Sequence, residues 1–162
     1  SHCCVFDDGN GNWYFASQGR FPKNAGGNAS SNDLMMGHVR KIRWTEDGWP
    51  LVMPERYGAV PQDKIEESEL IGNWEHIDLS YSFGNQKTST QMTLAADHTV
   101  TEGPWKGVTW SYDAAKCTLV FSNGIELYLQ RETDWEASPR THTIVYAGYG
   151  DNYKTYWGKK SK

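Results

Sequence analysis

The chain has 162 residues and a formal net charge of -4, with acidic and basic residues mixed along its length. Its one dense basic run is Lys159-Lys160-Ser161-Lys162, so the charge pattern excludes the usual nucleic-acid-binding and acidic-membrane-binding proteins. No apolar run approaches the ~18 residues of a membrane span, and the first residues do not have the pattern of a signal peptide. We therefore expect a globular protein without nucleic-acid or membrane partners.

The three cysteines, Cys3, Cys4 and Cys117, have the spacing of neither a disulfide framework nor a metal site, and we interpret them as small apolar residues. The unusual quantity is the aromatic content of 14%, with eight Trp and nine Tyr. Aromatic side chains fill the cores of small β-proteins. On a surface they also form platforms for sugars, because an apolar ring face is combined with a polar tip. Carbohydrate binding is therefore a candidate function.

The first sixty residues predict two hairpins. A strand-like run at 2–6, a turn cluster at 7–12 and a run at 13–17 form the first, and we expect the chain to begin inside a fold. A long Gly- and Asn-rich loop is expected at 21–37. Loops of this length in compact folds often carry functional residues. In the segment 38–57, two β-rich runs flank Asp47-Gly48, which predicts a second hairpin.

The prolines Pro50 and Pro54 place the last arm of this second hairpin at a sheet edge. Four short antiparallel strands are typical of one propeller blade, whose faces need neighbours. No second copy follows at a period of about 40 to 50 residues, so we expect the other blades to lie outside this sequence.

The run 63–70 follows Pro61 and has an acidic first turn, which predicts a short capped helix or a linker turn. We place a boundary there, between a blade-like unit at 1–60 and a β-barrel unit at 61–162. After Gly72 the pattern is uniformly β, and seven or eight antiparallel strands favour closure into a small barrel, which removes sheet edges. The dipeptide Asn123-Gly124 predicts a type I′ hairpin between two of these strands.

Alternation of apolar and polar residues predicts which barrel side chains face inward. The expected inward set is Ile77, Leu79, Tyr81, Met92, Leu94, Val108, Trp110, Tyr112, Leu119, Phe121, Ile125, Leu127, Leu129, Ile144 and Tyr146. Because many of these side chains are large, the sequence predicts a filled barrel interior.

Several runs carry a resemblance to a known family. In the first sixty residues they are His2 to Asp8, Trp13 to Arg20, His38-Val39-Arg40-Lys41-Ile42, Trp44-Thr45-Glu46-Asp47-Gly48-Trp49-Pro50 and Pro54-Glu55-Arg56-Tyr57. In the remainder they are Gly72-Asn73-Trp74-Glu75-His76-Ile77 and Tyr156-Trp157-Gly158-Lys159-Lys160. The first group resembles the last propeller blade and the following linker of family 43 glycoside hydrolases, in particular the two-domain endo-α-1,5-L-arabinanases, and the second group is similar to the first and last strands of that family's C-terminal barrel. The resemblance implies an all-β chain: the last blade of a five-bladed β-propeller, as a partial catalytic domain at 1–60, followed by a small closed antiparallel, lipocalin-like β-barrel as an accessory domain at 61–162.

The resemblance also implies a chemistry, namely inverting hydrolysis of α-1,5-arabinofuranosyl linkages in plant cell-wall arabinan. An inverting pair of carboxyl groups stands roughly 6.5 to 9.5 Å apart to admit water. In the family the catalytic carboxylates belong to earlier blades, so this chain supplies no catalytic residue and is expected to be inactive alone. A second polypeptide carrying the remaining blades is the implied partner. Because arabinan is a polymer, the implied location is secreted or periplasmic.

The resemblance assigns one residue a role beside a metal ion. Family members place a His early in the last blade, next to a calcium or sodium ion on the propeller axis, and His2 matches that position. An imidazole there can hold the hydration shell of the ion. Without the resemblance, a histidine near a terminus is a surface residue. His76, His98 and His142 show no ligand spacing and are expected to be structural or exposed.

For sugar contact we select Trp13 in the blade and Trp105 and Trp135 near turns of the barrel, whereas Trp110 lies in a core register. The carboxylates that adjoin turns are interpreted as solvated turn residues rather than acid/base pairs. They are Asp7, Asp8, Glu46, Asp47 and Glu55.

Two alternatives to a part of an arabinanase stay open. One is a non-catalytic carbohydrate-binding β-barrel module with an aromatic platform. The other is a lipocalin-like carrier of an apolar ligand, which requires a hollow interior and is disfavoured by the large inward residues.

Overall fold

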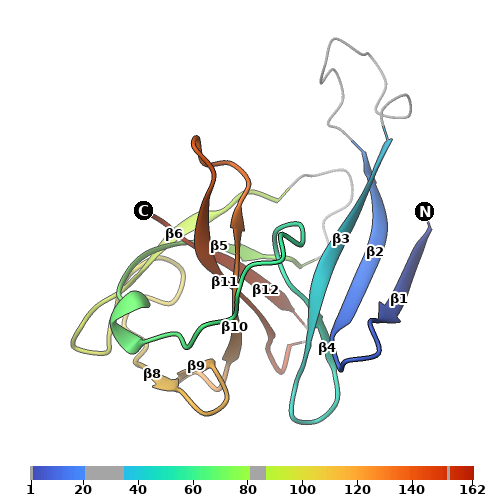
Figure 1. The fold of residues 1–162 in the computed structure, drawn as a ribbon. Helices are drawn as coiled ribbons and strands as arrows, with labels where there is room; N and C mark the ends of the chain where they lie inside the picture. Colours follow the sequence, from blue (N-terminus) through green and yellow to red (C-terminus); the bar gives the residue numbers. More distant parts are fainter. Residues whose placement is uncertain (1, 21–34, 81–86, 153) are drawn as a thin grey trace.

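The computed structural model describes residues 2–20, 35–80, 87–152 and 154–162, which form two antiparallel β-sheets (Figure 1). The only helical element in these ranges is the 3-10 turn η2, Glu67–Glu69, so the all-β prediction is confirmed. Within the same residues, no helix has the length and apolar character that crossing a membrane would require.

The first sheet has four strands in the order β1-β2-β3-β4, as the two predicted hairpins require. We call it the four-stranded sheet. The short strand β4 lies at an edge, where the prolines place it. Most of the predicted loop at 21–37 lies outside the described residues, and the next strand begins at Met35. The strands are β1 Cys3–Asp7, β2 Trp13–Arg20, β3 Met35–Trp44 and β4 Pro50–Val52.

The second sheet has eight strands in the order β7-β6-β5-β12-β11-β10-β9-β8. A bridge between Thr99 and Thr109 joins its two ends, so the sheet is a nearly closed barrel, as predicted. The predicted first and last barrel strands are neighbours, with Trp157 opposite Ile77. The strands are β5 Gly72–Asp78, β6 Thr90–Leu94, β7 Val100–Glu102, β8 Trp110–Asp113, β9 Thr118–Phe121, β10 Glu126–Asp134, β11 Thr141–Tyr149 and β12 Thr155–Lys160.

The Asn123-Gly124 hairpin is present, but its turn is not type I′. Gly124 has a φ of 85°, whereas Asn123 is not among the residues with positive φ. Gly124 N donates to Phe121 O at 3.0 Å, and Phe121 N donates to Ile125 O at 3.0 Å. This pattern is a three-residue loop in which glycine supplies the left-handed position. The predicted hairpin is correct and the predicted turn type is wrong.

The barrel interior is filled. Trp74 and Tyr146 are fully buried with ring centroids 5.0 Å apart, and most of the predicted inward residues surround them. In β5, however, Trp74 and His76 face inward, and Ile77 lies on the outer face against the junction with the other sheet. The predicted inward register of Ile77 and Leu79 is therefore wrong, and Tyr81 lies outside the described residues.

A second core lies on the outer surface of the barrel, beside the four-stranded sheet. Leu51 and Met53, at and beyond β4, pack with Tyr128, Val145 and Ala147 on the outer surface of the barrel. Because the four-stranded sheet covers this part of the barrel, the strands beneath it carry apolar residues on both faces. Alternation then no longer distinguishes the inner face from the outer face.

The segment between the sheets is held along its length. The short capped helix or linker turn predicted at 63–70 is the 3-10 turn η2, capped by reciprocal bonds between Glu66 and Glu69. Arg131 of β10 donates to Asp63 O at 2.9 Å, to Lys64 O at 2.8 Å and to the Glu69 carboxylate at 2.9 and 3.0 Å. The predicted boundary between residues 60 and 61 stays a prediction.

Candidate functional site

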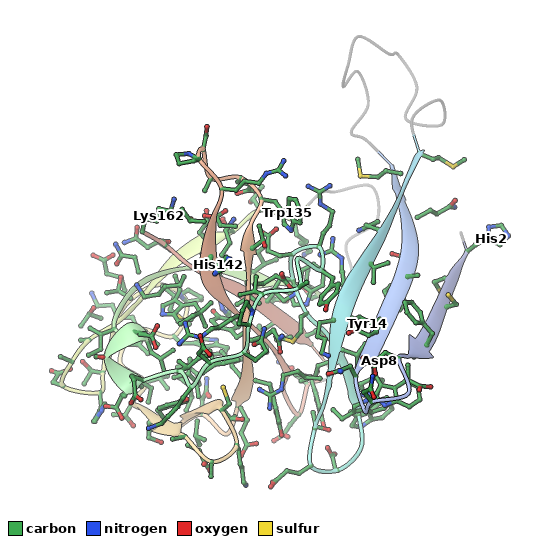
Figure 2. All side chains as sticks on the ribbon, in the orientation of Figure 1. His2, Asp8, Tyr14, Trp135, His142 and Lys162 are labelled. Atoms are coloured by element: carbon green, nitrogen blue, oxygen red, sulfur yellow. The ribbon has the colours of Figure 1, made fainter. Side chains whose placement is uncertain are left out.

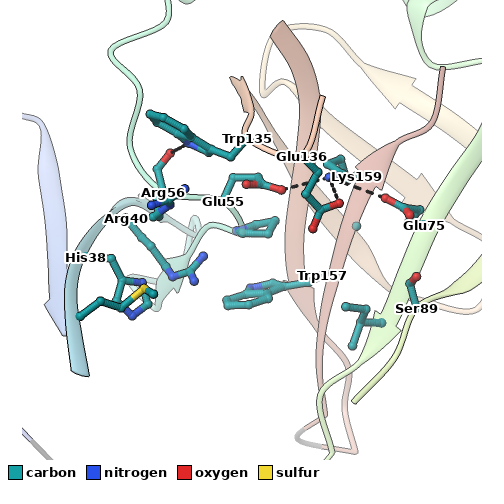
Figure 3. A pocket seen from close by; sticks show the side chains of 14 residues that line it. His38, Arg40, Glu55, Arg56, Glu75, Ser89, Trp135, Glu136, Trp157 and Lys159 are labelled. Atoms are coloured by element: carbon teal, nitrogen blue, oxygen red, sulfur yellow. Dashed lines mark hydrogen bonds and ion pairs between the residues drawn. The ribbon is translucent and has the colours of Figure 1, made fainter. Parts of the chain in front are cut away.

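A cleft of about 450 Å³ lies between the four-stranded sheet and the barrel (Figure 3). We call it the junction cleft. One wall comes from β3 and the segment 54–56, and the other comes from β5, β12 and the turn after β10. Its charged and aromatic lining residues are His38, Arg40, Glu55, Arg56, Glu75, Trp135, Glu136, Trp157 and Lys159.

The barrel wall of the cleft follows from strand alternation. In β12, Tyr156 belongs to the inner core, so the alternate residues Trp157 and Lys159 point outward toward the other sheet. Lys159 lies directly opposite Glu75 in the pairing of β12 with β5. The two outward side chains therefore form a cross-strand pair of opposite charge.

Lys159 is the centre of an ion network in this wall. Its Nζ lies 2.9 Å from Glu136 Oε2, 3.1 Å from Glu55 Oε1, 3.3 Å from Asp134 Oδ1 and 3.8 Å from Glu75 Oε2. Only 12% of the Lys159 side chain is exposed. Burial by itself lowers the pKa of Lys159, but the hydrogen bonds and charges of Glu136 and Glu55 raise it well above its usual value. The ammonium group is therefore charged at every physiological pH.

Glu55 has an unusual backbone conformation, with a φ of 68°. A non-glycine residue in this region costs on the order of 1–3 kcal/mol and persists where its surroundings hold it. Here the ion pair with Lys159 holds the side chain, which is only 16% exposed. The interpretation of Glu55 as a solvated turn residue is therefore wrong.

Cations stacked on aromatic rings connect the two walls of the cleft. The Arg40 guanidinium lies 5.1 Å from the centroid of the Trp157 ring. Two guanidinium groups lie over Trp135, from Arg56 at 4.6 Å and Arg140 at 4.5 Å, and the Trp135 indole donates to Arg56 O at 2.8 Å. These cation–π contacts fix the orientation of both indoles.

His38 is a neutral member of the cleft. Burial, followed by the charges of Arg40 and Arg56, lowers the pKa of His38 below its usual value of 6.5. A neutral imidazole can donate one hydrogen bond and accept another. The nearby carboxylates are bound to Lys159 and so are not poised as an acid/base pair. The junction cleft is therefore suited to structural linkage or ligand binding and not to hydrolysis.

The predicted metal residue His2 is exposed and lies at the edge of the four-stranded sheet away from the barrel (Figure 2). Across the described residues there is no group of three or more His, Cys, Asp or Glu side chains that could hold a metal ion. The residues present therefore do not form a calcium or sodium site by themselves. The assignment of His2 stays a prediction that depends on ligands from outside this chain.

The three predicted sugar-binding tryptophans lie in three separate places. Trp13 is half-buried on β2 and packs edge-on against Trp44, with centroids 5.6 Å apart. Trp135 lines the junction cleft next to Arg56 (Figure 3). Trp105 lies in another pocket at one end of the barrel. The structure thus brings none of them together, and their contact with sugar stays a prediction.

The sequence reasoning missed the ion network. Its members come from four separate parts of the chain, and no spacing rule joins them: they are Glu55, Glu75, the nearby pair Asp134 and Glu136, and Lys159. A partial signal was present in Trp157 and Lys159, two outward positions of the last strand that carry an aromatic ring and a charge where a solvent-facing strand would be uniformly polar.

The sequence and the fold of this chain are similar to those of known proteins. The curated protein "Extracellular endo-alpha-(1->5)-L-arabinanase 2" of Bacillus subtilis (strain 168) is 20% identical over 162 residues, which covers 96% of this chain and 31% of that protein. A crystal structure of the family 43 glycoside hydrolase YxiA protein from Bacillus licheniformis superposes with a TM-score of 0.79 at 21% identity, over 100% of this chain and 35% of that one.

The endo-1,5-alpha-L-arabinanase of Thermotoga petrophila RKU-1 gives a TM-score of 0.75 at 18% identity, over 100% of this chain and 35% of that chain. The chain thus spans about a third of the length of the relatives it matches. The family model for the GH43 C-terminal lipocalin-like domain (GH43_C) matches residues 54–158. The chain therefore belongs to the GH43 C-terminal lipocalin-like domain family.

Proposed function

We propose that this chain is the C-terminal portion of an extracellular family 43 glycoside hydrolase that cleaves α-1,5-L-arabinofuranosyl linkages in arabinan. In this proposal the four-stranded sheet is the last blade of a five-bladed propeller, and the barrel is an accessory domain that holds it. The catalytic carboxylates and most ligands of a calcium or sodium ion lie on blades outside this chain. This chain therefore contributes to the reaction by holding the last blade in place and not by supplying catalytic groups.

The single observation that carries this proposal is the asymmetric covering of the four-stranded sheet. Its β4 edge packs into the second core, whereas all five residues of β1 are exposed, including Val5 at 50% and Phe6 at 42%. A strand of this composition on an open edge presents unpaired backbone groups and apolar side chains to a neighbour. We infer that the preceding blade covers this side.

The barrel holds the sheet through buried and directional contacts. Arg43 of β3 donates to three barrel carbonyls, Leu129 O at 2.7 Å, Cys117 O at 3.0 Å and Lys116 O at 3.0 Å. The Trp157 indole donates to Val52 O at 2.8 Å. Because these bonds join the outer edge of the blade to a filled barrel, they support a role in fixing the last blade within a closed propeller.

Isolation of the native protein with an antibody to this chain tests the proposal. The isolated protein should release oligosaccharides from linear α-1,5-arabinan, and NMR of the first products should show inverted anomeric configuration. The 162-residue chain produced alone should fold and release none. Hydrolysis of arabinan by this chain alone, or no hydrolysis by the native protein, would contradict the proposal.

A second candidate function, non-catalytic binding of an arabinan chain, is favoured by an aromatic groove of about 470 Å³ beside β4. Trp49, Tyr149 and Trp157 line it, and Trp49 is 59% exposed. Calorimetric titration of the chain with arabino-oligosaccharides tests this role. Loss of binding in Trp49→Ala, with binding kept in Trp44→Ala, would support it, and no binding by the unaltered chain would reject it.

A further inference from the structure

A second pocket, of about 510 Å³, opens at one end of the barrel, and its lining residues are not those of the junction cleft. We call it the mouth pocket. Its lining includes the rings of His76, Trp105 and Tyr156 and the charged residues Asp78, Lys87 and Lys154. A volume of several hundred cubic ångströms is the usual size of a small-ligand site. The barrel is thus filled in its interior but hollowed at its mouth.

His76 supplies a buried, oriented donor to this pocket. Its side chain lies 98% out of solvent, at 2% exposure, and its Nδ1 is 2.6 Å from the hydroxyl of the fully buried Tyr146. That imidazole nitrogen is the acceptor available to the Tyr146 hydroxyl within the described residues, so Nδ1 accepts the bond. The proton of the neutral ring then sits on Nε2.

The His76 ring is neutral at pH 7, because burial lowers the pKa of His76 to about 4. The ring lines the mouth pocket, and within the described residues no hydrogen bond from Nε2 is seen. The one fully buried side-chain polar atom without a partner in these residues is Thr141 Oγ1, so Nε2 is not sealed from solvent. An N–H group at a pocket wall can donate to a ligand oxygen.

Aromatic rings form the sides around this donor. The Trp105 ring lies edge-on to His76 at 4.8 Å between centroids, and the Tyr156 ring stacks on His76 at 5.5 Å. Trp105 and Tyr156 also contact each other at 5.1 Å. These contacts hold the rings rigidly, and an aromatic surface of this kind accepts the apolar C–H face of a sugar ring.

The rim of the mouth pocket carries an excess of positive charge. Lys154 Nζ lies 3.1 Å from Asp78 Oδ2, and Lys87 Nζ lies 3.4 Å from the Ser80 hydroxyl. Two ammonium groups thus face one carboxylate. A ligand with a single negative charge would balance the rim, and the lysine–carboxylate hydrogen bonds would be charge-assisted.

We propose that the mouth pocket binds one uronic acid residue, a sugar ring that carries a carboxylate. The carboxylate lies between Lys87 and Lys154, a ring or hydroxyl oxygen accepts from His76 Nε2–H, and hydroxyls donate to Asp78. The C–H face of the ring packs on Trp105. This site does not depend on hydrolysis of arabinan, because the junction cleft and the missing blades take no part in it.

NMR titration of the whole 162-residue chain tests the proposal with two probes that differ only in the carboxylate. These are methyl α-D-galactopyranosiduronate and its neutral partner methyl α-D-galactopyranoside. The uronate should shift the Trp105 indole and the Thr88 and Thr90 amides, and the neutral sugar should bind at least about tenfold more weakly, because it loses a charge-assisted bond. Equal binding of the two sugars would overturn the proposal.

Variants separate this site from general attraction to a positive surface. Lys87→Met and Lys154→Met keep the apolar stem and should each weaken uronate binding about tenfold or more. Lys116→Met, at an exposed ion pair with Glu46 elsewhere on the molecule, should leave it unchanged. The proposal would be contradicted if Lys116→Met weakened uronate binding equally. It would also be contradicted if inorganic phosphate bound as tightly as the uronate, because the site would then recognise negative charge and not the sugar ring.

Discussion

Lys159 Nζ lies 3.1 Å from Glu55 Oε1, so an ion pair with both side chains mostly buried joins the last barrel strand to the segment that leaves the four-stranded sheet. Three further carboxylates, from Glu75, Asp134 and Glu136, complete the surroundings of this one ammonium group. The junction between the two sheets is thus held by charge as well as by the second core.

Removal of the Lys159 charge should destabilise the chain strongly. In Lys159→Met the four carboxylates lose their shared cation, and breaking a buried pair from one side costs about 3–5 kcal/mol. Urea unfolding measured by tryptophan fluorescence gives the free energy. Lys116→Met is the matched control, because its pair with Glu46 spans the same junction but is exposed and should be worth about 1 kcal/mol or less. Equal losses of unfolding free energy in the two variants would show that the Lys159 network stabilises the chain no more than an exposed ion pair does.

Arg43→Lys should also destabilise the junction. One ammonium group cannot reproduce the planar donors that reach Cys117 O, Leu129 O and Lys116 O, and unpaired carbonyls cost about 1–3 kcal/mol. We expect a lower urea midpoint and faster hydrogen exchange in β4. A variant as stable as the unaltered chain would mean that water replaces these bonds without loss.

Gly158→Ala should be among the most damaging small substitutions. A Cβ at Gly158 would overlap the ring of the fully buried Tyr146, and overpacking a filled core costs about 1–3 kcal/mol or more. Gly37→Ala in β3 is the control, because nothing lies within 4 Å of the added carbon. Thermal unfolding of both variants compares them, and a tolerated Gly158→Ala would indicate a looser barrel interior than the structure shows.

His76 should make the stability of the chain depend on pH. Burial lowers the pKa of His76 from 6.5 to about 4, so the unfolded chain takes up this proton first as pH falls. Stability contributed by the neutral ring is present above pH 6.5 and is lost progressively down to about pH 4, on the order of 3 kcal/mol in all.

The check is an NMR titration of the His76 ring together with urea unfolding at several pH values. The ring should titrate near pH 4, and His76→Gln, which cannot take up the proton, should show a shallower decline in stability below pH 6.5. A His76 ring that titrates near 6.5 would contradict this assignment.

Much of the fold could be predicted from local sequence. The turn residues Asp47-Gly48 and Asn123-Gly124 mark their hairpins because glycine takes the left-handed position cheaply. The alternation of apolar and polar residues correctly predicted the inward side chains of those barrel strands whose outer face is exposed to solvent. It failed at Ile77, because the outer face of β5 and β12 lines the junction cleft and carries Ile77 and Trp157 beside charged residues, instead of polar residues alone.

The functional residues were less predictable because they meet only in the folded chain. The mouth pocket combines Trp105 with His76 and Lys154, and the His76 donor exists only because Tyr146 occupies the other ring nitrogen. Composition identified aromatic rings as candidates for sugar contact. It could not indicate that Trp135 is stacked with Arg56 and Arg140 while Trp49 is left exposed.

The mass of the native protein tests the central claim most directly. This chain accounts for 18.4 kDa and about a third of the length of its relatives. If it is the last blade and barrel of a hydrolase, native mass spectrometry of the protein isolated with an antibody to the barrel should show a particle about three times heavier, whose additional sequence supplies the other blades. A folded, monomeric native species of 18.4 kDa that hydrolyses arabinan would contradict the account.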